Sequence, residues 1–286
     1  MTVNSITTAQ NSVESAIAFA SRKTGVDFNY LLGQAQVESG LRANAKAGTS
    51  SASGLYQFIE QSWLSVVKKH GAEHGLGWAA DAIQPGAGGR LTVGDANTRQ
   101  AILSLRNDPA TASLMAAEHA ADNKTSIEGT LGRAATGTDL YVAHFLGLGG
   151  AQNFLKSLAT NPDSIGAAQF PAAARANRNV FYTPNGQPRT VNEIYQRFAA
   201  KLDSGAAAGG ATGLASAVLD NGGLPGNGDT DTEIIPGIGE SLGGATRWAQ
   251  ATIDRLNTTE NRAAQLLRPT PDLARLAYLT LARLGG

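Results

Sequence analysis

Apolar residues recur at helical spacing through most of the first 200 positions of this chain. Within residues 28–39 they fall on one helical face, at Phe28, Leu31, Leu32 and Ala35. Asp27 precedes this run as a capping residue, and Gly40 follows it as a stop signal. The pattern predicts a helix that carries Glu38 in its last turn, at the edge of the apolar stripe.

The same periodicity, together with capping signals, predicts further helices at 11–22, 54–69, 96–106, 108–128, 138–147, 151–159 and 190–202. Residues 43–53 and 84–95 are rich in small and glycine residues and read as loops. Asn185-Gly186 is a strong turn signal between two short extended runs. The fold class expected is all-α, with one small β-hairpin within 179–189.

The composition changes at Ser204, because twelve of the 34 glycines lie between Gly205 and Ala245. A glycine-rich segment of this kind is typical of a flexible linker. We expect a domain at 1–203, a linker at 204–245 and a helical tail at 246–286. The tail should hold two helices, at 246–268 and 271–284. The second is apolar nearly all round, so it should bury itself against its neighbour, the domain, another copy or a protein partner.

Charge and rare residues exclude several classes of function. The formal net charge is +0, with 23 basic and 23 acidic residues, and no basic block is interleaved with aromatics, so no nucleic-acid partner is expected. The chain has no cysteine, and its four histidines form no His-Glu-x-x-His pattern, so we expect no metal and no cofactor.

Residues 1–21 lack a basic start and a continuous apolar core, so no secretory signal is predicted. No stretch approaches the ~18 consecutive apolar residues of a membrane-spanning helix.

Glu38 is the leading candidate for chemistry. A carboxyl group partly removed from water holds its proton more readily, and such a group can act as a general acid. The alternative is an ordinary exposed carboxylate at the end of a helix. Ser50 and Ser51 in the following loop could hydrogen-bond this carboxyl group or could be plain loop residues.

Three short motifs follow one another along the chain: Glu38-Ser39-Gly40-Leu41, Gly54-Leu55-Tyr56-Gln57 and Tyr141-Val-Ala-His144-Phe145-Leu-Gly147. Together they resemble the motifs of the soluble lytic transglycosylases, lysozyme-like enzymes that cut the glycan strands of peptidoglycan. The family usually has Met at the position of Tyr56. Most relatives carry Ala-Tyr-Asn-Ala-Gly at the third motif, where this chain resembles a proteobacterial and phage subgroup. The resemblance spans roughly residues 28–150.

The resemblance implies a lysozyme-like domain in which Glu38 acts first as acid and then as base. Such an enzyme cleaves the bond between N-acetylmuramic acid and N-acetylglucosamine and leaves a 1,6-anhydro sugar. Tyr141 would be a second catalytic residue. The substrate-binding residues implied are Ser39, Ser51, Tyr56, Gln57, His144 and Phe145.

Several alternatives remain open at this stage. Tyr56 and His144 could instead be core residues, because aromatic side chains at helical spacing are often buried. The protein could be a hydrolytic lysozyme of goose type, or a module that binds or assembles cell wall without catalysis. An enzyme of this type would meet its substrate in the periplasm or the cell wall, by another export route or after removal of a leader.

Overall fold

The computed structural model describes residues 3–48 and 50–219 of the chain. The expected tail helices at 246–268 and 271–284, and the part of the expected linker after Leu219, lie outside these residues. The described residues form α1 (Val3–Thr24), α2 (Phe28–Ser39), α3 (Glu60–His70), α4 (Gly77–Ala82), β1 (Ile83–Pro85), β2 (Leu91–Val93), α5 (Ala96–Ser104), α6 (Pro109–Leu131), α7 (Gly137–Thr160), α8 (Gly166–Gln169), α9 (Pro171–Ala176), α10 (Arg178–Phe181) and α11 (Val191–Ala208), with 3-10 turns at Gly71–His74 (η1), Ala87–Gly89 (η2) and Leu105–Asn107 (η3).

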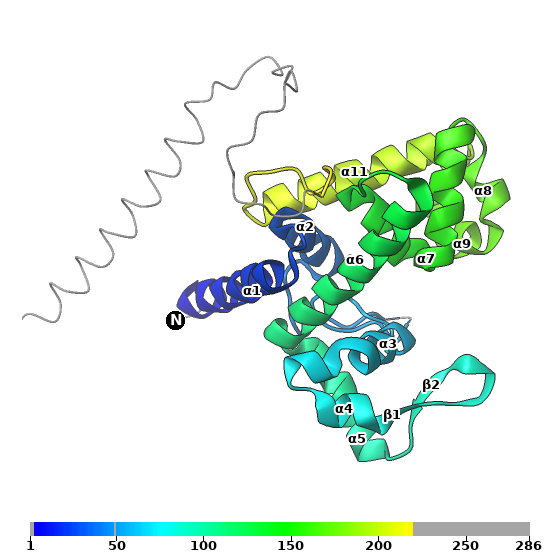
Figure 1. Ribbon diagram of the computed structural model, residues 1–286. Helices are drawn as coiled ribbons and strands as arrows, with labels where there is room; N and C mark the ends of the chain where they lie inside the picture. The colour runs from blue at the N-terminus through cyan, green and yellow to red at the C-terminus, as the bar shows by residue number, and fades with distance from the viewer. Residues whose placement is uncertain (1–2, 49, 220–286) are drawn as a thin grey trace, which may run out of the picture. The chain divides into compact units, whose positions relative to one another are not determined.

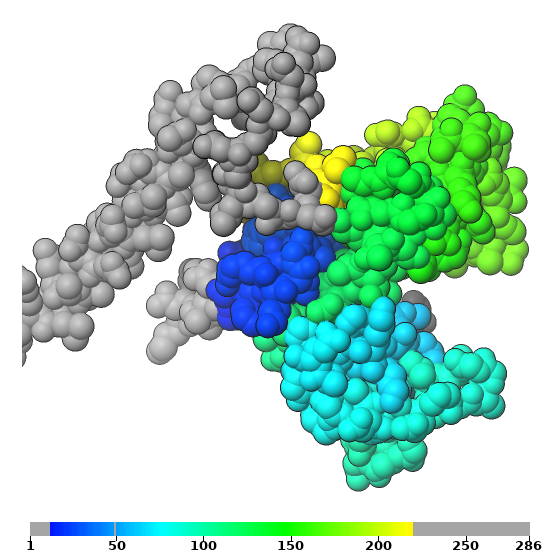
Figure 2. All heavy atoms as spheres, viewed as in Figure 1, coloured from blue at the N-terminus to red at the C-terminus, as the bar shows by residue number. Residues whose placement is uncertain are grey.

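Helix α6 runs through the middle of this unit and packs against α1, α2, α3 and α7 (Figure 1). Helix α11 lies against α2 and α7, so α2 is covered on several sides. Trp63 is fully buried, and its indole nitrogen donates a hydrogen bond to the Ile102 carbonyl at 2.8 Å. On the face shown in Figure 2, the surface is hollowed between α3–α5 and α7–α9.

The mainly helical class expected from the sequence is confirmed for the described residues. Local capping explains why several boundaries match. Asp27 accepts a hydrogen bond from the Tyr30 backbone at 2.8 Å, and Gly40 ends α2 in the left-handed region at φ 62°. Asp108 and Pro109 start α6 in the same local way. No helix among the described residues has the length and apolar content needed to span a membrane.

The hairpin expected within 179–189 is confirmed only in part. The turn does form, with Gly186 at φ 80°, but only one antiparallel bridge joins Tyr182 to Pro188. The preceding segment folds instead as the short helix α10, and the Arg189 guanidinium donates hydrogen bonds to the carbonyls of Asn179, Val180 and Tyr182. The two-stranded antiparallel sheet of the described residues is β1–β2, which starts one residue before the segment expected to be a loop at 84–95 and pairs Ile83 with Val93.

The helix expected from position 54 begins only at Glu60. Residues 54–57 form a turn in which Gly54 has φ 83° and Gln57 has φ 48°. A Cβ atom at Gly54 would stand 1.8 Å from the Arg106 carbonyl oxygen, so the backbone there approaches closer than any side chain permits. This close approach keeps the segment out of the helix.

The expected linker also starts later than position 204. Helix α11 continues to Ala208, and a Cβ atom at Gly205 would lie 2.7 Å from Val37 Cγ2 on α2. Ala215 and Leu219 are buried, and the Leu219 backbone donates to the Ala135 carbonyl at 2.9 Å. Residues 204–219 therefore belong to the folded unit, and the glycine at 205 serves helix packing rather than flexibility.

Candidate active site

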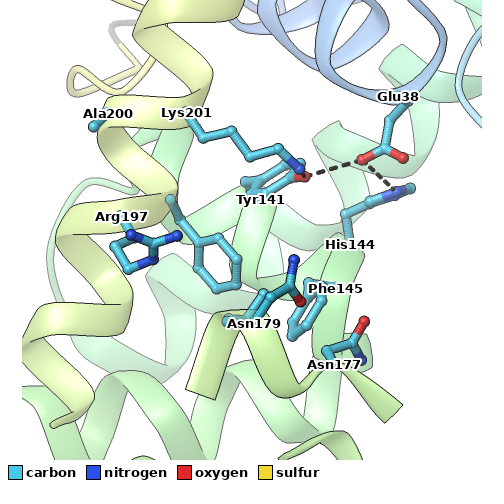
Figure 3. A pocket seen from close by; sticks show the side chains of 11 residues that line it. Glu38, Tyr141, His144, Phe145, Asn177, Asn179, Arg197, Ala200 and Lys201 are labelled. Carbon is cyan, nitrogen blue, oxygen red and sulfur yellow. Dashed lines mark hydrogen bonds and ion pairs between the residues drawn. The ribbon is translucent and has the colours of Figure 1, made fainter. Parts of the chain in front are cut away.

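Glu38 stands in the last turn of α2, where neighbouring residues such as Leu31 and Ala35 are buried. Its own side chain keeps 19% exposure. Figure 3 shows its carboxylate pointing toward Tyr141 and His144, which come from α7. A buried helix thus holds a carboxyl group in a fixed place at the edge of the core.

The Tyr141 hydroxyl donates a hydrogen bond to Glu38 Oε1 at 3.0 Å. Burial raises the pKa of the Tyr141 phenol, and the negative charge of Glu38 raises it further. The phenol therefore keeps its proton at neutral pH and acts as the donor to the carboxylate. No hydrogen bond or ion pair within residues 3–48 and 50–219 reaches the other carboxylate oxygen, Oε2.

His144 lies one turn after Tyr141 on α7, with Nε2 3.6 Å from Glu38 Oε1. The two rings are stacked, with their centroids 6.0 Å apart. Burial lowers the pKa of His144 by more than the nearby Glu38 carboxylate raises it, and Lys201 lowers it as well. The imidazole is therefore neutral at pH 7 and forms a polar part of the cavity wall.

Helix α11 brings a cation to the same place. Lys201 Nζ donates a hydrogen bond to the Tyr141 hydroxyl at 3.1 Å and lies 5.6 Å from the centre of its ring. Phe198, on the same helix, packs edge-on against Tyr141 with the centroids 5.3 Å apart. The Tyr141 hydroxyl thus accepts from Lys201 while it donates to Glu38, which fixes its direction.

These groups line a cavity of about 600 Å³ (Figure 3). Among the described residues that line it, Glu38 is the only carboxylate, and the others supply nitrogen donors and apolar surface. Beside Glu38 they are Tyr141, His144, Phe145, Asn177, Asn179, Val180, Arg197, Phe198, Ala200 and Lys201. The lining suits a neutral or anionic polar ligand better than a cation, because two cationic side chains face one carboxylate.

The α7 residues singled out in the sequence are brought together with Glu38. Tyr141, His144 and Phe145 all line the cavity, and Phe145 packs against Phe198 with the centroids 5.0 Å apart. His144 is therefore a cavity residue, so the alternative of a core histidine remote from the site does not hold.

Two serines predicted to bind substrate do not reach the cavity. Ser39 is buried, and its hydroxyl donates to the Ala35 carbonyl one turn earlier in α2, at 3.0 Å. Ser51 is exposed, and its hydroxyl accepts a hydrogen bond from the Glu60 backbone at 3.4 Å. Both hydroxyls serve the local backbone, and neither contacts Glu38.

The second motif is placed differently from the expectation as well. Tyr56 is fully buried, so the prediction that it stacks on a sugar is wrong and the core alternative holds. Gln57 donates from Nε2 to the carbonyls of Gly54 at 2.9 Å and Ala45 at 3.2 Å. Its amide is therefore occupied by the loop, because the turn with φ 48° directs the side chain back onto its own backbone.

Four polar residues of the cavity were missed in the sequence: Asn177, Asn179, Arg197 and Lys201. One usable signal was present, because Arg197 and Lys201 are four positions apart on a predicted helix and so share a face. Asn177 precedes α10 and Asn179 lies within it, at the start of the segment predicted to be a hairpin. No sequence signal pointed to either residue.

No protein-family model matches this chain. The chemistry available at the site follows from its atoms. Glu38 is held by the Tyr141 phenol, which Lys201 contacts in turn, and its second oxygen has no partner among the described residues. Such a carboxyl group at a cavity wall can give a proton to a bound ligand and take one back.

Proposed function

We propose that this protein is a lytic transglycosylase that cleaves peptidoglycan glycan strands, within a lysozyme-like domain. The observation that carries the proposal is the placement of Glu38 at the cavity wall. Oε1 accepts from Tyr141, and Oε2 has no hydrogen-bond or ion-pair partner among the residues that the structure describes. The three sequence motifs support the same assignment, since the first and third supply these residues.

In the first step, Glu38 would protonate the glycosidic oxygen between N-acetylmuramic acid and N-acetylglucosamine. Because Oε1 accepts from Tyr141, the proton to be given would sit on Oε2. As the bond between the anomeric carbon and this oxygen breaks, Glu38 becomes a carboxylate. The hydrogen bond from Tyr141, itself directed by Lys201, then becomes stronger and stabilises the charge.

In the second step, the C6 hydroxyl of the muramic acid would bond to its own anomeric carbon, and Glu38 would accept the proton that this hydroxyl loses. The product is a 1,6-anhydro sugar, and no water is consumed. A second carboxylate is not required when the substrate's acetamido group supports the positive charge, an exception to the two-carboxylate scheme. A cavity with one carboxylate among its described lining residues fits this route.

The remaining lining residues suit such a substrate. Arg197, Asn177 and Asn179 offer donors for acetamido carbonyls and for carboxylates of the peptide stem. Phe145 and Phe198 offer apolar surface for sugar rings. The glycan strand would be met in the periplasm or the cell wall, and the segment 246–286 would serve docking or self-association.

A hydrolytic lysozyme of goose type is the second candidate, since the same acid could instead activate a water molecule. Digestion of purified sacculi followed by mass spectrometry of the muropeptides separates the two. We expect anhydromuramic ends, which are lighter by one water than reducing ends. Products with mainly reducing ends would assign the protein to the hydrolytic lysozymes.

Glu38→Gln tests whether the domain is catalytic at all. The substitution keeps the shape of the side chain but removes the exchangeable proton, so we expect cleavage to fall by about 10²–10⁴-fold or more. Glu14→Gln on α1 is a matched control that should keep full activity. Near-full turnover by Glu38→Gln would reject Glu38 as the catalytic acid and with it the assignment. No turnover by the wild-type chain would favour a binding module.

A further inference from the structure

A second group of titratable side chains lies outside the cavity, where the end of α3 and the turn η1 meet α6. His70 ends α3, Glu73 and His74 lie in η1, and Glu118 and Asp122 lie one turn apart on α6. None of the five lines the cavity beside Glu38. The proposed glycan chemistry does not use them.

The unusual atom in this group is His70 Nδ1. It is buried, as is most of the His70 side chain, which is 12% exposed, and it has no hydrogen-bond partner among the described residues. Two carboxylate oxygens face it, Glu118 Oε2 at 3.5 Å and Glu73 Oε2 at 3.8 Å. One ligand atom from each of these three residues lies within 4.8 Å of the others. That spacing brings one nitrogen and two oxygens around a common point.

Neighbouring groups hold these atoms in place from behind. His70 Nε2 lies 2.9 Å from Asp122 Oδ2, and Asp122 Oδ1 accepts from Lys69 Nζ at 2.6 Å. Glu118 Oε1 lies 2.7 Å from His74 Nε2. A histidine that binds metal through one nitrogen commonly donates its other N–H to a carboxylate, and carboxylate ligands are themselves hydrogen-bonded.

This arrangement leaves negative charge around His70 Nδ1 that the neighbouring groups do not balance. When Nε2–H donates to Asp122, His70 Nδ1 directs its lone pair toward two carboxylates. Three carboxylates and one lysine leave an excess of two negative charges around that point. Three acceptors facing one another repel unless a positive charge stands between them.

We propose that His70 Nδ1, Glu73 and Glu118 form a binding site for a divalent transition-metal ion of the Zn²⁺ class. A mixed imidazole and carboxylate set favours such ions over Mg²⁺ and Ca²⁺, which take oxygen ligands. The bound ion ties the end of α3 and the turn η1 to α6, so its role is structural.

The proposal departs from the sequence analysis, which expected no metal. In the structure the Glu118 side chain is 16% exposed and faces both His70 and His74. The signal available was the spacing of Glu118 and Asp122, which puts both on the face of α6 that meets the two histidines.

The test is metal binding by the full-length chain without a histidine tag, after treatment with a chelator. Calorimetric titration should show one Zn²⁺ per chain and weaker or absent binding of Mg²⁺. Co²⁺ should give the visible absorption of a site with nitrogen and oxygen ligands. The melting temperature should rise with Zn²⁺ and not with Mg²⁺.

Variants then locate the site. Glu73→Gln is the most informative, because its side chain is 66% exposed and its loss should leave the metal-free fold intact. We expect Glu73→Gln and His70→Gln to abolish the stoichiometric binding. Asp122→Asn should weaken it by about 10- to 100-fold, as loss of a supporting carboxylate usually does. Asp163→Asn, at an exposed position, and His144→Gln, in the cavity, should both retain it.

Two outcomes would overturn the proposal. If the wild-type chain takes up no Zn²⁺ or Co²⁺, the group is an ion-pair network and not a metal site. If Glu73→Gln and His70→Gln bind metal as well as the wild type does, the ion sits elsewhere. Glycan cleavage is not a readout here, so failure of this proposal is distinguishable from failure of the proposed function.

Discussion

Helix α7 and the loop at 43–58 both carry side chains that the sequence motifs placed beside Glu38. From α7, Tyr141 and His144 reach the carboxylate, within 3.0 Å and 3.6 Å of Oε1. From the loop, Tyr56 turns into the core and the Gln57 amide bonds to loop carbonyls. The two regions therefore have different roles, although the motifs predicted that both line the substrate site.

The loop is held from inside the protein. The Arg106 guanidinium donates from Nη1 to the carbonyls of Ser51 at 2.8 Å and Phe58 at 2.9 Å. The Ser53 hydroxyl donates to the Asn107 side chain at 3.0 Å. The side-chain polar groups of Ser51, Ser53 and Gln57 are thus bonded within the protein.

The difference follows from what each backbone dictates. On a helix, residues three apart share a face, so the common direction of Tyr141 and His144 could be predicted. In a loop, the direction of a side chain depends on the dihedral angles of each residue. Gln57 has a positive φ of 48°, a conformation that is uncommon for residues other than glycine and that the sequence did not predict.

The largest effect is expected for the loop region, whose packing against His119 should make the stability of the protein fall in acid. His119 on α6 packs edge-on against Phe58 of the loop, with the ring centroids 6.0 Å apart. Burial lowers the pKa of His119 to about 4, below the ordinary value of about 6.5. Between these values the unfolded chain binds a proton that the folded chain does not, so the free energy of unfolding falls as the pH falls, by about 3 kcal/mol in total.

Denaturant unfolding of the wild type and of His119→Gln, from pH 6.5 down to 4.5, measures this effect. The variant should show a shallower pH dependence, by up to about 1.4 kcal/mol per pH unit. The slope is the readout because the substitution changes the packing at every pH. Equal slopes in the two proteins would mean that His119 already carries its proton in the folded state.

Two tyrosine substitutions contrast the regions directly. Tyr141→Phe removes the hydroxyl that donates to Glu38, and loss of a hydrogen bond to a charged group corresponds to a roughly 10- to 100-fold fall in turnover. Tyr56→Phe keeps the buried ring and should change turnover by less than about twofold. Rates on purified sacculi, with melting temperatures for both variants, give the comparison. Equal losses of activity would place the loop back in the site.

The parts of the fold that could be predicted are those with local causes. Asp27 and Gly40 bound α2 through hydrogen bonds and dihedral angles within a few residues, and capping at Thr190 starts α11 in the same way. The contact of Lys201 with Tyr141 could not be predicted, because it joins positions 60 residues apart. It joins α11 to α7, and α11 also packs closely against α2.

That approach has a visible cause in the structure. A Cβ atom at Gly33 would lie 2.8 Å from the Leu202 carbonyl, and one at Gly205 would lie 2.9 Å from the Gly33 carbonyl. Two glycines, one on each helix, allow the backbones to meet. In the sequence, Gly205 begins a glycine-rich segment, and composition alone does not distinguish a packing glycine from a flexible one.

Lys201→Met sharpens the comparison within the site itself. The substitution keeps the apolar stem but removes the ammonium that orients the Tyr141 hydroxyl. Because Lys201 acts through Tyr141, we expect a smaller loss of turnover, about tenfold or less. Lys156→Met, at an exposed position of α7, is the matched control. In a Tyr141→Phe background the same change should cost less, and full additivity would show that Lys201 acts by another route.

The smallest effect is expected at Gln57, and it should fall on stability rather than on cleavage. Gln57→Ala removes the donor to the carbonyls of Ala45 and Gly54, which should lower the free energy of unfolding by about 1 kcal/mol. The folded variant should cleave within about twofold of the wild-type rate, because the Gln57 amide does not line the cavity. Gln100→Ala, at an exposed position of α5, controls for loss of a glutamine. Unchanged stability with a raised KM for sacculi would instead show that Gln57 leaves the loop to hold the sugar, and the contrast between helix and loop would fail.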